Sequence, residues 1–197
     1  EIKFNGKDIT SLTPPDRAAL GIARTFQNIA LFRGLSVLDN LMLGRHVRMR
    51  SGLLSSLLYW GPALKEEVEH RERCEEVIDF LKLTALRKQP AGSLAYGLQK
   101  RVELGRALAA DPDLLLLDEP MAGMNQEEKE DMVRYVLDAN QLLRTSIVLI
   151  EHDMGVVMDI SDEVAVLDMG LKIAQGTPDE VRANPKVVEA YLGTGKS

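Results

Sequence analysis

The segment LLLLDEP at residues 114–120 constrains the fold of this chain more than any other. Four consecutive leucines suit a strand that is buried on both faces of a parallel sheet, and the proline ends that strand. Asp118 and Glu119 therefore stand at the carboxyl end of the strand, where open α/β sheets bind ligands. The pair suits Mg²⁺ binding and activation of a water molecule, as in nucleotide hydrolysis. It is also compatible with a solvated acidic turn.

Composition narrows the class of protein. The 197 residues, 45% of them hydrophobic, suffice for one domain with a substantial core and a small subdomain. A net charge of −6 without a basic stripe argues against a nucleic-acid partner. Cys74 is the only cysteine, so an internal disulfide is excluded, and we expect it to pack in the core of a protein from a reducing compartment.

The order of the expected elements predicts an α/β fold. Helices and strands alternate after residue 93, and such alternation requires a parallel sheet with right-handed crossovers. An Asn5-Gly6 turn follows the first strand, and residues 168–171 form the turn of a late hairpin. We expect strands at residues 1–9, 22–26, 114–120, 146–150, 164–167 and 172–175, and helices at 14–21, 37–44, 62–83, 97–110, 126–143 and from 178 and 185 onward.

The mostly helical segment before residue 93 contains an apolar patch. Its members have helical spacing, which favours packing in the core over docking on a membrane partner. The patch consists of Leu53, Leu54, Leu57, Leu58, Tyr59 and Trp60.

Two segments that precede the acidic strand carry chemically useful groups. Gln27 ends an expected strand, where its amide could reach a metal ion or a water molecule. The turn LAYGLQ at residues 94–99 leads into a helix whose N-terminal amides can bind an anion, and Gly97 would let a phosphate approach the backbone. Taken alone, each segment also has an ordinary structural interpretation.

Two further segments follow the acidic strand. Asn125 stands at the tip of the loop AGMN, directly after the carboxylates. His152 follows the strand at 146–150 and is therefore expected at the same sheet edge as Asp118 and Glu119. A histidine at that edge is well placed to contact a phosphate.

Together and in this order, the segments resemble the ATP-binding-cassette (ABC) ATPases. TFQN resembles the Q-loop of that family, LAYGLQKR its LSGGQ-type signature, LLLLDEP its Walker B segment, AGMN its D-loop and IEHD its switch histidine. TFQNIALF, LAYG, LIEHDM, ISDEVAVLD and EAYLG look most like the ATP-binding subunits of bacterial branched-chain amino acid importers, with the related urea importers as the alternative.

The resemblance implies a P-loop NTPase-like (RecA-like) α/β fold, in which helices flank a mostly parallel sheet and an α-helical subdomain is inserted. Residues 1–33 would be the remnant of the N-terminal strands with the Q-loop, and residues 34–92 the helical subdomain. Residues 93–177 would hold the signature helix and the core with Walker B and the switch histidine. Residues 178–197 would form C-terminal helices and a tail.

The resemblance also implies ATP and Mg²⁺ as cofactors and assigns roles to residues. Asp118 would bind Mg²⁺ through water, together with Gln27, which would also sense the site. Glu119 would be the general base, and His152 would contact the γ-phosphate. The residues expected to face ATP held by a second subunit are Leu94, Ala95, Tyr96, Gly97, Gln99 and Asn125.

The implied partners are a second ATP-binding subunit, identical or different, and an integral membrane permease that the helical subdomain contacts. The implied location is peripheral, at the cytoplasmic face of the bacterial inner membrane. Two other classes of protein fit the sequence less well. A DNA-repair or chromosome-organising ATPase is disfavoured by the acidic charge and the short insert, and a non-catalytic regulatory module by the joint presence of Gln27, Asp118, Glu119 and His152.

The sequence departs from the family pattern at three places. Ala95 replaces the usual serine, and Leu98 the usual glutamine, so backbone amides must carry more of the phosphate binding. The Walker A pattern G-x-x-x-x-G-K-S/T is absent, because the terminal Gly195-Lys196-Ser197 has Ala190 in place of the first glycine. We therefore expect an N-terminally incomplete ATPase whose 197 residues alone have negligible activity.

Overall fold

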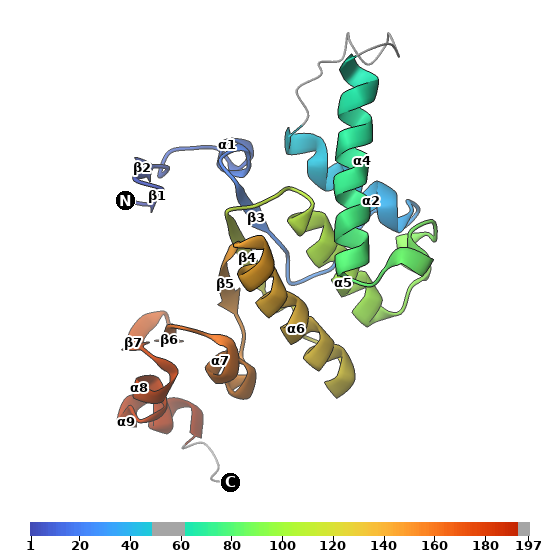
Figure 1. Ribbon diagram of the computed structural model, residues 1–197. Helices are drawn as coiled ribbons and strands as arrows, with labels where there is room; N and C mark the ends of the chain where they lie inside the picture. Colours follow the sequence, from blue (N-terminus) through green and yellow to red (C-terminus); the bar gives the residue numbers. More distant parts are fainter. Residues whose placement is uncertain (49–61, 193–197) are drawn as a thin grey trace. The chain divides into compact units, whose positions relative to one another are not determined.

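The computed structural model describes residues 1–48 and 62–192 (Figure 1). The chain divides into two compact units, residues 1–149 and residues 150–197. Both units combine helices and strands, which confirms the predicted α/β class. The apolar patch between Leu53 and Trp60 and the terminal Gly195-Lys196-Ser197 lie outside the described residues.

The first unit begins with a β-hairpin of β1 (Lys3–Phe4) and β2 (Lys7–Asp8). The two residues between the strands, Asn5 and Gly6, have φ values of 49° and 76°. Two successive left-handed residues form the tight turn that suits the twist of paired strands. The predicted Asn5-Gly6 turn is therefore confirmed.

A three-stranded sheet in the order β3-β4-β5 follows, built from β3 (Ile22–Arg24), β4 (Leu114–Asp118) and β5 (Ser146–Ile150). β3 and β4 are parallel, with Ile22 opposite Leu114. β3 is shorter than the predicted strand at 22–26 because the Phe26 amide turns away from β4 and donates to the carboxylate of Glu103. The parallel pairing brings the carboxyl ends of β3 and β4 to the same edge.

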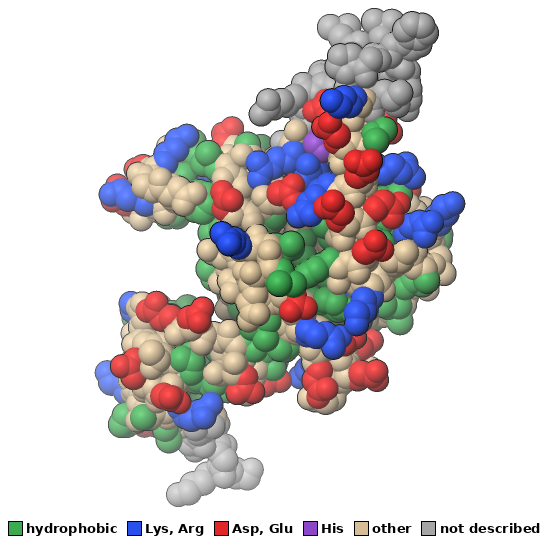
Figure 2. Space-filling view, in the orientation of Figure 1, with side chains coloured by type: hydrophobic (Ala, Val, Ile, Leu, Met, Phe, Trp, Pro, Cys, Tyr) green, Lys and Arg blue, Asp and Glu red, His purple; other side chains and the backbone are tan. Residues whose placement is uncertain are grey.

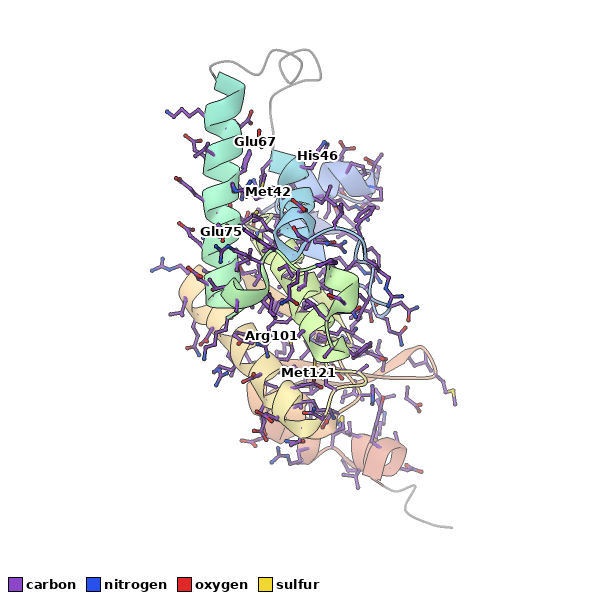
Figure 3. All side chains as sticks on the ribbon, turned by 90° about the vertical axis from the view of Figure 1, so that its right-hand side faces the viewer. Met42, His46, Glu67, Glu75, Arg101 and Met121 are labelled. Atoms are coloured by element: carbon purple, nitrogen blue, oxygen red, sulfur yellow. The ribbon has the colours of Figure 1, made fainter. Side chains whose placement is uncertain are left out.

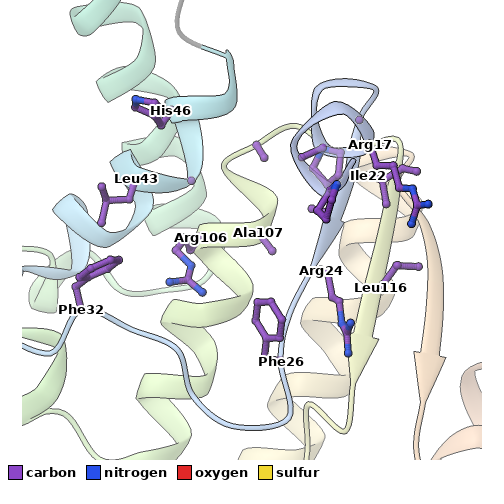
Figure 4. Close-up of a pocket in the computed structure, with 17 residues that line it drawn as sticks. Arg17, Ile22, Arg24, Phe26, Phe32, Leu43, His46, Arg106, Ala107 and Leu116 are labelled. Atoms are coloured by element: carbon purple, nitrogen blue, oxygen red, sulfur yellow. The ribbon is translucent and has the colours of Figure 1, made fainter. Parts of the chain in front are cut away.

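The two faces of β4 differ in burial. Leu115 and Leu117 are completely buried, whereas Leu114 and Leu116 are only half-buried. Leu116 lines a hollow of about 1000 Å³, with β3 on the same wall and α2 (Val37–Arg45) opposite (Figure 4). The prediction that β4 is buried on both faces is thus correct for one face, because the described residues leave the other open at this hollow.

Short and long helices surround the sheet. α1 (Pro14–Ala19) precedes β3, and α2 is capped by Ser36, whose Oγ accepts from the Asp39 amide at 3.1 Å. The long α4 (Pro62–Phe80) ends before the predicted residue 83, since Lys82 adopts a left-handed φ of 53°. Charged side chains, most of them acidic, lie along its visible face (Figure 2). The described residues of this unit also include the 3₁₀ turns η1 (His46–Arg48), η2 (Thr84–Leu86) and η3 (Ala91–Ser93).

The helices pack closely around α5 (Tyr96–Leu108). A β-carbon on Gly44 of α2 would lie 2.1 Å from the carbonyl oxygen of Arg106, so the two helices approach each other at a glycine. Cys74 of α4 is completely buried, and this burial raises the pKa of its thiol to about 11. The predicted packing role of Cys74 is confirmed.

An ionic cluster at the end of α5 joins three helices. The Asp111 carboxylate accepts from Arg45 of α2 and, at 2.6 Å, from Nε of Arg73 in α4. Burial raises the pKa of Asp111, but the hydrogen bonds from Arg73 and Arg45 outweigh this effect and lower it overall. Arg45 also lies 3.1 Å from Nδ1 of the buried His70. Asp111 is therefore the ionic link between α2, α4 and the end of α5.

The last helix of the first unit is α6 (Gln126–Leu143), which has the predicted bounds. Arg101 of α5 contacts it, donating to Asp131 at 3.0 Å and lying over the Tyr135 ring, 4.9 Å from the ring centre (Figure 3). Both contacts fix α5 against α6. Within the described residues, no helix combines the length and hydropathy needed to cross a membrane.

The second unit has its own small core of Met158, Val164, Val166, Val181 and Val187. Its elements are α7 (Met154–Ile160), the antiparallel pair β6 (Val164–Asp168) and β7 (Leu171–Gly176), α8 (Pro178–Arg182), α9 (Pro185–Val187) and a π-helical turn η4 (Val188–Leu192). The predicted hairpin and the helix starts at Pro178 and Pro185 are confirmed.

Candidate functional site

The candidate site centres on the turn after β4. Glu119 has a φ of 45°, a left-handed conformation that is unfavourable for a residue with a side chain. The turn is held by a hydrogen bond from the Ala122 amide to the Glu119 carbonyl oxygen at 3.2 Å and by the buried Met121 (Figure 3). The fold therefore maintains a strained backbone at the second of the two carboxylates.

Gln27 and Glu119 meet at this edge of the sheet. The Gln27 Nε2 atom donates to Oε2 of Glu119 at 3.1 Å, although the residues are 92 positions apart in the sequence. The contact follows from the parallel pairing of β3 and β4, because Gln27 follows the first strand and Glu119 the second. The structure thus brings together the predicted amide and the predicted general base.

Asp118 has a partner that sequence reasoning missed. Its Oδ2 accepts from Nη2 of Arg24 at 2.9 Å, and its amide lies 3.4 Å from the Thr25 hydroxyl. Arg24 pairs with Leu116 in the β3/β4 register, and Asp118 is two residues further along the same face of β4. The strand register could have suggested this ion pair once β3 and β4 were known to be neighbours.

The donor atoms near β4 suit a hard cation. Asp118 offers a carboxylate and Gln27 an amide oxygen, and Mg²⁺ commonly takes one or two protein oxygens while water and phosphate complete its shell. The part of the chain described here contains no cluster of three or more His, Cys, Asp or Glu residues that could hold a metal alone. Any Mg²⁺ at Asp118 must compete with the Arg24 guanidinium for Oδ2.

The turn at residues 94–99 begins α5 without a side-chain cap. Ala95 occupies the N-cap position, where its methyl group cannot accept from the first amides of the helix. Leu94 is buried, Tyr96 is 46% exposed, and the Gln99 side chain folds back to donate to the Leu94 carbonyl oxygen at 2.7 Å. The backbone amides of the first turn of α5, starting at Tyr96, are therefore suited to binding an anion.

The turn lies against the loop that follows the carboxylates. A β-carbon on Gly97 would stand 2.2 Å from Oε1 of Glu128, and one on Gly123 would stand 3.1 Å from the Tyr96 ring. Asn125 caps α6: its Oδ1 accepts from the Glu128 amide at 3.0 Å, while its own amide donates to Glu128 at 3.1 Å. Its side-chain oxygen is therefore engaged in the helix cap. The Glu128 side chain therefore lies between the buried Gly97 of the turn and Asn125 at the start of α6.

His152 belongs to the second unit. Its side chain is exposed, its amide donates to Oε2 of Glu151 at 3.3 Å, and its Nδ1 lies 4.0 Å from the same carboxylate oxygen. It follows the end of β5 with only Glu151 between them, as predicted from the sequence. Its approach to Glu119 stays a prediction.

Comparison with known proteins identifies the family. Residues 1–122 match the sequence model of the family described as "ABC transporter", which covers more than half of the chain. Residues 172–197 match a second one, described as "Branched-chain amino acid ATP-binding cassette transporter". The chain belongs to the ABC transporter family, and the predicted resemblance and ATPase class are confirmed.

Named relatives are similar over nearly the whole chain. A high-affinity branched-chain amino acid transport ATP-binding protein, LivG of Salmonella typhimurium, is 39% identical over 192 residues, which is 98% of this chain and 75% of the relative. The protein of the same description from Pseudomonas aeruginosa, BraF, is 36% identical with the same coverage. The chain thus spans about three quarters of each relative's length.

Solved structures agree with this assignment. The ADP conformation of MJ1267, an ATP-binding cassette of an ABC transporter, has a TM-score of 0.77 and 35% identity, with 96% of this chain and 75% of that chain covered. A nucleotide-free ATP-binding cassette has a TM-score of 0.76 and 34% identity, with 95% and 75% covered. The predicted P-loop NTPase-like fold class is confirmed.

Proposed function

We propose that this chain is the ATP-binding and ATP-hydrolysing subunit of an ABC importer that powers uptake of branched-chain amino acids through a membrane permease. The names of LivG and BraF and the family match at residues 172–197 support the choice of solute. The same findings favour branched-chain amino acids over urea as the transported solute. The subunit would lie at the cytoplasmic face of the bacterial inner membrane, with the helical subdomain at residues 34–92 against the permease.

The observation that carries the proposal is the contact of Gln27 with Glu119 beside Asp118. In the proposed mechanism, Asp118, through water, and Gln27 would hold Mg²⁺, which would neutralise charge on the phosphates. Glu119 accepts a proton from the attacking water at its carboxylate. Gln27 donates to that carboxylate and so fixes its orientation. His152 is assigned to the γ-phosphate.

The turn at the start of α5 supplies the second half of a shared site. Leu94, Ala95, Tyr96, Gly97 and Gln99 would face the phosphates of ATP held by a second subunit, with Asn125 at the same interface. Because Ala95 has no hydroxyl, the backbone amides and the dipole of α5 must carry the attraction to phosphate.

The phosphate-binding loop is not supplied by these 197 residues, since they contain no complete G-x-x-x-x-G-K-S/T pattern. Backbone amides and a lysine normally cradle the β- and γ-phosphates in that loop. We therefore expect negligible ATP turnover by the purified 197-residue chain alone. Steady turnover that disappears in Glu119→Gln would contradict this expectation.

The proposal is tested by uptake of radiolabelled leucine in cells from which the native gene has been deleted. Returning the wild-type gene should restore uptake, and returning Glu119→Gln should leave it lower by about a hundredfold or more, the usual range for loss of a general base. Glu189→Gln makes the same chemical change at an exposed position in η4 and should behave as wild type. Wild-type uptake with Glu119→Gln would refute the proposed role, and normal uptake by the deletion strain would refute the proposed transport function.

A further inference from the structure

The Gln27 loop, residues 25–30, is held by the middle of α5. Three polar side chains of this helix, spaced three residues apart on one face, reach the loop backbone: Lys100, Glu103 and Arg106. None of them was singled out by the sequence analysis. They connect the predicted Q-loop to the helix that begins with the phosphate-binding turn.

Glu103 makes the central contact. Its Oε1 accepts from the amides of Phe26 at 3.5 Å and Ala30 at 3.4 Å, at the two ends of the loop. The residue is only 2% exposed, and this burial raises its pKa although the two amides and neighbouring cations act in the opposite direction. A carboxyl group buried this deeply is costly unless it is hydrogen-bonded. The hydrogen bonds from the loop amides to Glu103 therefore stabilise the loop in this arrangement.

Lys100 holds the loop at Gln27 itself. Its Nζ donates to the Gln27 carbonyl oxygen at 2.8 Å, and the side chain is nearly as buried as that of Glu103. Arg106 adds a hydrogen bond from Nη1 to the Ala30 carbonyl oxygen at 2.5 Å. Backbone donors and acceptors on both sides of the Gln27 side chain are thus fixed by one helix.

The Gln27 side chain then reaches Glu119. We propose that Lys100 and Glu103 are positioning residues: by fixing the backbone around Gln27 they keep its amide on the Glu119 carboxylate, and they couple that contact to the turn at residues 94–99. This inference rests on the proposed function. It adds a physical connection between the Gln27–Glu119 contact and the proposed phosphate-binding turn at residues 94–99. A shift of α5 along its axis would move the Gln27 backbone, because Lys100 and Glu103 belong to the same rigid helix.

Amide exchange measured by heteronuclear NMR on the 197-residue chain tests the positioning without any nucleotide. Glu103→Leu should accelerate exchange of the Phe26 and Ala30 amides by about tenfold, the expected loss for one hydrogen bond. Amides inside α6, such as that of Val136, should keep their rates. Glu103→Gln retains a side-chain oxygen acceptor and should restore slow exchange. A purely structural effect would accelerate all of these amides together.

The NMR signal of the Gln27 side-chain amide reports whether Gln27 still contacts Glu119. Glu119→Ala, which removes the acceptor, defines the position of the Gln27 signal when the contact with residue 119 is lost. In Lys100→Met and Glu103→Leu the Gln27 signal should move toward that position, and in Lys100→Arg it should stay close to wild type. Lys100→Met also provides the test if Glu103→Leu fails to fold.

Leucine uptake separates failure of this inference from failure of the proposed function. If Glu119→Gln lowers uptake, Lys100→Met should lower it as well at equal protein abundance, and Lys100→Arg should recover it. If Glu119→Gln leaves uptake intact, the proposed function fails while the NMR result still decides the positioning. An unchanged Gln27 signal in folded Lys100→Met, or unchanged Phe26 and Ala30 exchange in folded Glu103→Leu, would overturn the inference.

Discussion

Arg24 and Asp118 form an ion pair across β3 and β4, with Nη2 of the arginine 2.9 Å from Oδ2 of the aspartate. The Arg24 guanidinium also lies over the Phe26 ring, 5.2 Å from the ring centre. Asp118 is the residue that we assign to Mg²⁺. The ion pair therefore occupies a carboxylate oxygen that a metal would use, and a metal bound at that oxygen would have to displace the Arg24 guanidinium.

Removing the arginine should strengthen metal binding at Asp118. Arg24→Gln frees Oδ2 and removes a positive charge about 3 Å from the site, so we expect affinity for divalent cations to rise by roughly three- to tenfold. Mn²⁺ is a suitable probe, because its paramagnetism broadens the NMR signals of nearby amides such as those of Asp118 and Thr25. Arg182→Gln, at an exposed position in α8, is the matched control. Equal broadening in wild type and Arg24→Gln would show that the ion pair does not compete with the metal.

Glu103 should make stability fall as the pH rises. Burial raises the folded-state pKa of its carboxyl group above the unfolded value, while Lys100 and Arg106 offset part of the shift. Between the two pKa values the unfolded chain has lost the proton and the folded chain keeps it, so rising pH favours unfolding. Glu103→Gln lacks this titration. The unfolding free energy of Glu103→Gln minus that of wild type should therefore increase as the pH rises above about 4, where a glutamate in the unfolded chain loses its proton.

This pH dependence is measured by urea unfolding at several pH values. A difference that stays constant over the range would show that the carboxyl group titrates equally in both states. Glu72→Gln, at an exposed position in α4, serves as the control and should leave the wild-type curve unchanged.

Asp111 should have the opposite dependence. Its folded-state pKa is lowered overall, because the hydrogen bonds from Arg73 and Arg45 outweigh the effect of burial. Its contribution is therefore complete above the unfolded pKa and is lost as the pH falls through the folded value. Asp111→Asn should cost about 1–2 kcal/mol at neutral pH, since the side chain is partly exposed and its two cations lose their partner. In urea unfolding, a loss of the same size at pH 3 and pH 7 would contradict this account.

Gly97 is a position where added volume should affect both packing and function. A β-carbon there would collide with Oε1 of Glu128, which pairs with Asn125 in the cap of α6. Gly97→Ala should lower the free energy of unfolding by about 1 kcal/mol, because it disturbs that cap. It should also lower leucine uptake, because the added methyl group keeps the phosphate away from the backbone. Gly34→Ala meets nothing within 4 Å and is the matched control. If Glu128→Ala restores full uptake to Gly97→Ala, the glycine serves packing and not phosphate.

The sequence predicted the elements with strong local signals. α6 and β5 have the predicted bounds, because Asn125 with Glu128 forms a capping box and the run SIVLI has few alternatives to a strand. The end of β3 was placed too late, since the Phe26 amide is taken by Glu103, which is 77 residues away. A contact between residues so far apart in the sequence produces no local sequence pattern from which it could be predicted.

The candidate site was predictable in part. Gln27 was expected at the end of a strand, and the family resemblance assigned it to the same site as Asp118; the structure brings its side chain to Glu119. The Arg24 ion pair and the buried Glu103 were not predictable, because each depends on which strand or helix lies beside which. Asn125 was expected at a loop tip, whereas its oxygen is engaged in a cap that the spacing to Glu128 could have revealed.

The central claim is that Glu119 activates water for ATP hydrolysis in a branched-chain amino acid importer. The most direct test is phosphate release by the purified permease complex, reconstituted in lipid vesicles with the subunit that the whole gene encodes, either wild type or Glu119→Gln. We predict ATP hydrolysis that branched-chain amino acids stimulate in the wild-type complex and that falls by about a hundredfold in Glu119→Gln, while ATP still binds. Equal phosphate release by the two complexes would contradict the account.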